Sequence, residues 1–117
     1  MKNLVIRQIK IENYIESGKV LIIYGPRQVG KTTIINTFLS EYKGKYRVYT
    51  GDSITTQEIF SSQRLEKLKE NVEDLDLLFI DEAQNIKNIG INLKIIVDAY
   101  PKLKVVVTGS SSFELTG

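Results

Sequence analysis

A glycine-rich segment in the first third of the chain has the residue types needed to hold phosphate. Its residues 25–32, GPRQVGKT, match the Walker A pattern G-x-x-x-x-G-K-[ST] at every fixed position. In such a loop, successive backbone N–H groups form an anion-binding concavity, and the following helix adds the positive end of its dipole. Lys31 is suited to reach the β- and γ-phosphates of a nucleotide, and the Thr32 hydroxyl is suited to bind Mg²⁺. A glycine turn without a ligand is the less favoured interpretation.

We therefore expect the whole loop, Gly25–Thr33, to bind the phosphates of a nucleotide, most simply ATP with Mg²⁺. Arg27 either contacts phosphate or projects into solvent, and the sequence does not favour one over the other. The expected nucleotide-binding residues are Gly25, Pro26, Arg27, Gln28, Val29, Gly30, Lys31, Thr32 and Thr33.

Two adjacent carboxylates, Asp81 and Glu82, follow the apolar run Leu77–Ile80. Because parallel strands present their carboxyl ends to one edge of a sheet, Asp81 is expected to help hold Mg²⁺ opposite Thr32, as a Walker B acid does. Glu82 can then orient or deprotonate the attacking water. The chain has no histidine, so Glu82 is the strongest candidate for the general base. The alternative is that both acids only cap the next helix.

Hydroxyl groups follow a further apolar run, Val105–Val107, near the end of the chain. Ser110 is the first candidate for a sensor of the γ-phosphate and Thr108 the second, while a polar turn is nearly as plausible. Asp52 could be a polar switch beside the site, although a turn residue is the stronger interpretation.

The composition limits the classes of protein that fit. The chain has 117 residues, 42% of them hydrophobic and 26% charged, which suits one ordinary soluble globular domain. A net charge of +2 is too balanced to indicate nucleic acid or membrane attraction. The absence of cysteine excludes disulfides and cysteine-based zinc sites. Neither a membrane span nor a secretory signal is evident, so a cytoplasmic location is expected.

The elements expected to position these residues alternate between strand and helix, which predicts an α/β fold with a parallel sheet and helices on both faces. Apolar runs predict buried strands, and apolar residues recurring at helical spacing predict amphipathic helices. Leu4–Ser17 shows a loose helical pattern, and 55–72 is expected to form a polar, broken helix. The expected strands are 20–24, 46–50, 76–81 and 104–108, and the other expected helices are 31–42 and 86–100.

Three segments together resemble a known family: GPRQVGKTT at 25–33, FIDEAQ at 79–84 and VTGSSSFEL at 107–115. They are similar to prokaryotic AAA-type P-loop ATPases (AAA_14-like) whose proteins carry a C-terminal DUF4143 domain. The resemblance implies a three-layer αβα fold of the ASCE type with strand order 5-1-4-3-2. It also implies ATP and Mg²⁺ as ligands, Thr32 and Asp81 at the metal, and catalytic roles for Lys31, Glu82 and the sensor Ser110.

The resemblance further implies a fifth strand, a lid, downstream arginines and a C-terminal domain that do not occur in 1–117. Residues 1–117 are therefore expected to be the N-terminal core of a larger ATPase that drives a partner or its own C-terminal domain. On that expectation the chain alone is a poor ATPase, and Val20–Tyr24 is an exposed edge strand that promotes self-association. The alternatives are a nucleotide-binding switch without useful hydrolysis, a fragment of a nucleic-acid helicase, since 81–84 reads D-E-A-Q, and, less favoured, a small-molecule kinase.

Overall fold

The computed structural model describes residues 2–5, 10–25 and 29–109, and for 2–5 and 29–32 it describes the backbone alone. Strands and helices alternate along most of the chain. The strands are β1 (Lys2–Val5), β2 (Val20–Tyr24), β3 (Tyr46–Thr50), β4 (Leu77–Asp81) and β5 (Lys104–Gly109). The α-helices are α1 (Val29–Glu41), α2 (Ile54–Phe60), α3 (Leu65–Val72) and α4 (Ile89–Ala99), and short 3₁₀ turns are η1 (Ile11–Asn13) and η2 (Ala83–Asn85).

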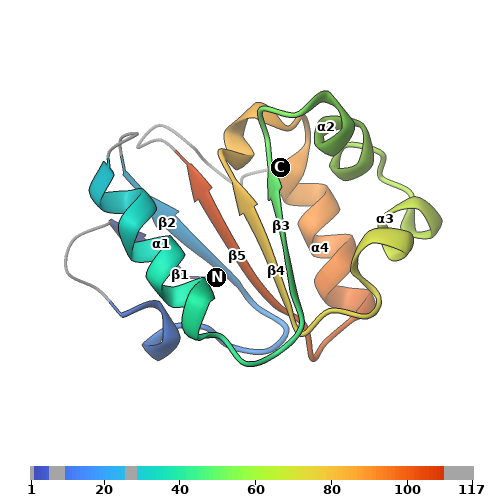
Figure 1. Cartoon of the computed structure of the whole chain (residues 1–117). Coiled ribbons are helices and arrows are strands. Elements are labelled where there is room, and N and C mark those ends of the chain that lie inside the picture. Colours follow the sequence, from blue (N-terminus) through green and yellow to red (C-terminus); the bar gives the residue numbers. More distant parts are fainter. Residues whose placement is uncertain (1, 6–9, 26–28, 110–117) are drawn as a thin grey trace.

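The strands form one five-stranded parallel sheet in the order β1-β2-β5-β4-β3. The four strands from β2 onward therefore follow the order 1-4-3-2 in the numbering of the sequence prediction, which confirms it. Figure 1 shows β5, which comes last among the strands, lying between β2 and β4. This order brings together segments that are far apart in the sequence, and it sets which strand ends are neighbours.

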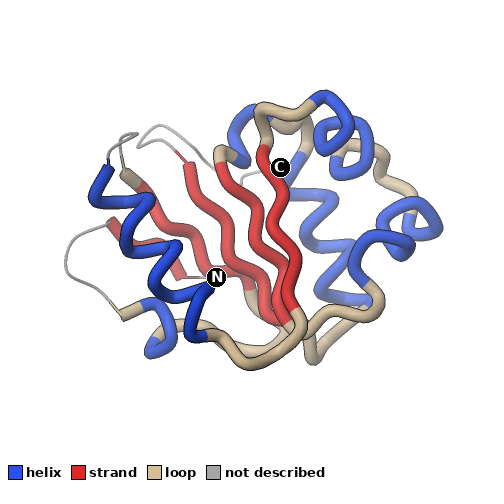
Figure 2. The backbone as a smooth tube through the Cα atoms, in the orientation of Figure 1, coloured by secondary structure: helices blue, strands red, loops and turns tan. Residues whose placement is uncertain are grey.

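The sheet separates two apolar layers, and together they make the predicted αβα sandwich (Figure 2). Strand residues alternate between the faces: Val20 and Ile22 pack toward α2, α3 and α4, whereas Leu21 and Ile23 pack toward α1 and η1. The central strands β2, β4 and β5 are buried almost throughout, as their continuous apolar runs predict for a sheet covered on both sides.

The edge beside β2 differs from the prediction. Lys2–Val5 does not continue a helix but forms β1, which pairs in parallel with β2 from Lys2↔Leu21 to Val5↔Tyr24. The prediction of an exposed first strand at Val20–Tyr24 is therefore wrong, and the argument for self-association through that strand loses its structural basis. The sheet position predicted to lack a strand is occupied by β1, because a short extended segment can satisfy the backbone groups of β2 regardless of its helical side-chain spacing.

The helices agree with the predictions in some segments and differ from them in others. The polar helix predicted over 55–72 is broken as expected, into α2 and α3, at a turn where Gln63 has φ 54°. The helix predicted over 86–100 begins only at Ile89, because Asn88 has φ 59° and stops the helix from extending backwards. Of the helix predicted over Leu4–Ser17, the described residues are 4–5 and 10–17, and among these only the single turn η1 is helical. Within the described residues, no helix is long and apolar enough to cross a membrane.

Candidate active site

The carboxyl ends of β2, β5 and β4 meet at one edge of the sheet. The Gly25 N–H, just after β2, donates to the Gly109 carbonyl at the end of β5 at 3.2 Å. The chain then passes from Gly25 to α1, which begins at Val29 and carries the backbone of Lys31 and Thr32 in its first turn. The predicted phosphate-binding loop thus connects a buried strand to a helix, the context in which this motif binds phosphate. Pro26, Arg27 and Gln28 lie outside the described residues.

The two predicted carboxylates lie at the carboxyl end of β4, at the same edge of the sheet. Figure 1 shows β4 next to β5, on the side away from β2. Asp81 is the last residue of β4 and is partly buried, and Glu82 follows it with only 5% of its surface exposed. Because β5 alone separates β4 from β2, and adjacent strands lie about 4.8 Å apart, the acids stand roughly 10 Å across the sheet from the start of the loop.

Thr108 connects the acids to the middle of the sheet. Its side chain is fully buried, and its hydroxyl donates to Asp81 Oδ1 while accepting from the Glu82 N–H at 3.0 Å. The bond engages only one of the two oxygens of the Asp81 carboxylate. Thr108 was the second candidate for a γ-phosphate sensor, yet its hydroxyl proton is directed to Asp81 rather than to the space above the loop.

Glu82 adopts a backbone conformation that is unfavourable for its residue type. Its φ of 53° and ψ of 47° lie in the left-handed region, which costs a non-glycine residue roughly 1–2 kcal/mol. Its side chain makes no capping hydrogen bond to η2, although it precedes that turn. Instead, Glu82 Oε2 accepts from Gln84 Nε2 at 3.0 Å. The geometry thus gives no support to the alternative that Glu82 serves as a helix cap.

Two further residues, Gly51 and Gln84, lie beside Asp81 and Glu82, and the sequence analysis did not single them out. The Gly51 N–H donates to the Asp81 carbonyl at 2.7 Å, and a Cβ at Gly51 would overlap the Glu82 carbonyl oxygen. Gln84 has a buried Oε1 with no hydrogen-bond partner among the described residues. In the sequence, Gly51 stands out only as a glycine directly after a predicted strand, and Gln84 only as the last residue of the FIDEAQ segment. Neither feature indicates which atoms of the acids these residues contact.

Asp52 matches the turn interpretation. Its N–H donates to Thr50 Oγ1 at 3.2 Å, and its Oδ1 accepts from Asn85 Nδ2 at 2.7 Å. The second of these bonds connects the turn after β3 with the turn after β4. The first candidate for the sensor, Ser110, lies outside the described residues.

The donor chemistry at this edge fits Mg²⁺. Asp81 supplies carboxylate oxygen and Thr32 is a hydroxyl residue, both hard oxygen donors of the kind that Mg²⁺ prefers. Among the described residues, no three histidine, cysteine or acidic side chains gather into a metal cluster. Magnesium at a nucleotide is usually held by one or two carboxylates together with waters and the substrate phosphates.

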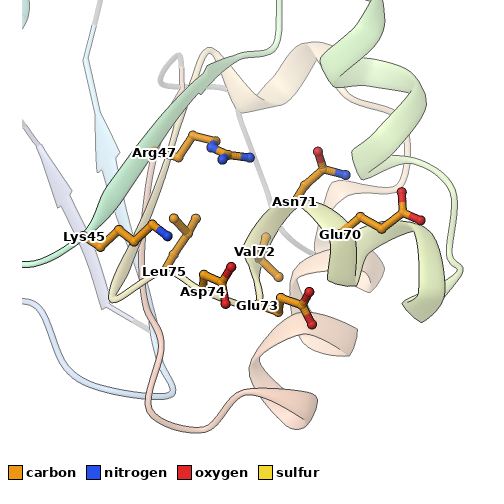
Figure 3. A pocket seen from close by; sticks show the side chains of 8 residues that line it. All are labelled: Lys45, Arg47, Glu70, Asn71, Val72, Glu73, Asp74 and Leu75. Carbon is orange, nitrogen blue, oxygen red and sulfur yellow. The ribbon is translucent and has the colours of Figure 1, made fainter.

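A separate pocket between β3 and α3 is less suited to binding a nucleotide (Figure 3). Its volume is about 30 Å³, and it lies toward the amino ends of β3 and β4, at the opposite edge of the sheet from Asp81. Arg47 donates to the Tyr49 hydroxyl at 3.1 Å, and this hydrogen bond raises the pKa of Arg47 above its ordinary value. The space suits about one water molecule rather than a nucleotide. It is lined by Lys45, Arg47, Glu70, Asn71, Val72, Glu73, Asp74 and Leu75.

Comparison with known proteins gives one match. A family model described as an AAA domain matches residues 17–117, which include every candidate site residue. No curated protein and no solved structure matches the chain.

Proposed function

Because the chain belongs to the AAA domain family, whose members bind and hydrolyse ATP in general, we propose that it binds ATP with Mg²⁺ at Gly25–Thr33. We further propose that hydrolysis at this site, in a larger ATPase, drives a partner or a C-terminal domain. The observation that carries the proposal is the shared sheet edge: the loop follows β2, the acids end β4, and β5 lies between them.

Each residue has a task that its chemistry suits. The backbone N–H groups of the loop and the first turn of α1 bind the phosphates, and Lys31 adds a mobile positive charge for the β- and γ-phosphates. Thr32 and Asp81 would hold Mg²⁺, which when bound neutralises charge on the phosphate oxygens. Glu82 accepts a proton from the attacking water or orients it. Ser110 remains our candidate for the residue that senses the γ-phosphate.

Nucleotide affinity tests the proposal directly. Lys31→Ala removes a charge-assisted contact worth about 1.5–3 kcal/mol, so the affinity for ATP with Mg²⁺ should fall about tenfold or more in calorimetry. The matched control is Lys102→Ala, because Lys102 is exposed and precedes β5 at the opposite edge of the sheet. Equal affinities of the Lys31→Ala variant and the unmodified protein would contradict the assignment of the loop.

Turnover separates hydrolysis from switching. We expect the protein to hydrolyse ATP when Mg²⁺ is present. The rate of hydrolysis should not depend on added DNA or RNA, since the net charge of +2 gives little attraction for nucleic acid. Tight binding without turnover in the intact protein would favour a nucleotide-binding switch. Strong stimulation by nucleic acid would favour the helicase alternative.

A further inference from the structure

We propose that Thr108 is a positioning residue for hydrolysis, which fixes the Asp81 carboxylate and the Glu82 backbone at the end of β4 so that both acids face the nucleotide. This inference rests on the proposed function and assigns a new role to a residue outside the loop. It differs from phosphate sensing, since Thr108 acts through the acids rather than by touching the ligand.

Thr108 places a hydroxyl group in a strand that is otherwise apolar at this point. Its three predecessors, Val105–Val107, are buried valines, and Thr108 itself is fully buried between β2 and β4. Valine has nearly the same shape as threonine and suits a strand covered on both faces. A buried hydroxyl is unfavourable unless it is hydrogen-bonded, so its presence where β5 passes the acids has to be explained by its partners.

This hydroxyl both donates and accepts a hydrogen bond, and its two partners are Asp81, the last residue of β4, and Glu82, which follows it. Its single proton goes to Asp81 Oδ1, and its oxygen accepts the Glu82 N–H at 3.0 Å. The first bond sets the rotation of the carboxylate, and the second sets the plane of the peptide that joins the two acids. A serine could make both bonds, whereas a valine could make neither.

The peptide is also held from the other side. The Gly51 N–H, at the end of β3, donates to the Asp81 carbonyl at 2.7 Å. Glu82 has φ 53°, a conformation that persists in a non-glycine residue only when its surroundings fix it. The turn after β4 is thus held between β3 and β5, and Thr108 is the side chain through which β5 takes part.

The expected consequence is a loss of catalysis larger than any loss of nucleotide affinity. Thr108→Val should lower kcat about 10- to 100-fold, as is typical when a partner of a metal-binding group is removed. It should raise the Mg²⁺ concentration needed for half-maximal rate and change the ATP affinity less than threefold. Thr108→Ser should restore most of kcat. Thr55→Val, at an exposed position of α2, is the control for the substitution itself.

Amide hydrogen exchange gives a readout that does not depend on turnover. The Glu82 N–H loses its acceptor in Thr108→Val, so its exchange should accelerate at least tenfold relative to buried amides of β4, and Thr108→Ser should restore the slow rate. Uniformly faster exchange across β4 would indicate general loosening of the sheet and would overturn the positioning role. Unchanged exchange at Glu82 would also overturn it.

A double-mutant comparison separates this inference from the proposed function. If Thr108 acts through the acids, Thr108→Val should lower the residual rate of Glu82→Gln far less than it lowers the normal rate. Normal kcat in Thr108→Val, with Glu82→Gln strongly impaired, overturns the positioning role and leaves the proposed function intact. Normal turnover in Glu82→Gln contradicts the proposed function itself.

Discussion

At the scale of single residues, Glu82 combines a carboxylate with a strained, nearly buried position. We predict that in the intact protein Glu82→Gln keeps ATP binding but lowers kcat about 10²- to 10⁴-fold, because an amide cannot accept the proton of the attacking water. Steady-state turnover with parallel calorimetry measures both quantities. Glu41→Gln, an exposed change at the end of α1, should leave both unchanged. A Glu82→Gln variant with near-normal turnover would refute the assigned base.

Gly51 illustrates how a residue without a side chain can hold a site. A Cβ there would overlap the Glu82 carbonyl oxygen and lie 3.0 Å from the Glu82 carbonyl carbon, both backbone atoms. We predict that Gly51→Ala lowers the free energy of unfolding by about 1–3 kcal/mol and also lowers turnover, since Glu82 must move.

Gly44 provides the matched control for Gly51. A Cβ at Gly44 would meet Tyr42 Cε2 at 2.8 Å and Asp76 Oδ2 at 3.0 Å, which are side-chain rather than backbone atoms. Gly44→Ala should therefore cost less in urea denaturation and leave turnover unchanged. Equal effects of the two substitutions would show that the Gly51–Glu82 contact is not special.

At the scale of elements, Asn92 of α4 connects two turns that contain residues with positive φ. Its Oδ1 accepts the Gln63 N–H at 2.7 Å, and its Nδ2 donates to the Asn88 carbonyl at 2.8 Å, while the side chain is fully buried. We predict that Asn92→Ala lowers the free energy of unfolding by about 1–3 kcal/mol through loss of both bonds. The affinity for ATP should not change, because these turns pack on the face away from α1.

The control for this prediction is Asn36→Ala, since Asn36 is exposed on α1. A surface change of this kind should stay within about 0.5 kcal/mol of the unmodified protein. If both asparagine variants unfold at the same urea concentration, the hydrogen bonds of Asn92 do not stabilise the break between α2 and α3.

At the scale of the whole molecule, β1 covers the backbone edge of β2. We predict that a variant lacking residues 1–5 associates at lower protein concentration than the unmodified chain, because the N–H and C=O groups of the apolar strand Val20–Tyr24 lose their partner on that side. Light scattering over a concentration series measures the difference. Identical association of the two proteins would mean that the pairing with β1 does not protect this edge.

Most of the fold could be predicted from local patterns along the chain. The run Val20–Tyr24 with its glycine-rich loop, and the run Leu77–Ile80 followed by Asp81 and Glu82, predict a parallel α/β sheet and the strand ends at which the loop and the two acids lie. These inferences succeeded because burial on both faces selects continuous apolar strands, and because parallel strands end at a common edge. The order of the four central strands came instead from the family resemblance.

Only the tertiary structure shows which segments that are distant in the sequence contact one another. Nothing in Lys2–Val5 indicates that it pairs with β2, because backbone hydrogen bonding depends little on which side chains are present. The hydroxyl of Thr108 meets Asp81 and Glu82, and Gly51 meets the peptide between them, only through the register of β3, β4 and β5. The sequence by itself determined which groups are available for catalysis, whereas the register determined which backbone and hydroxyl groups hold them.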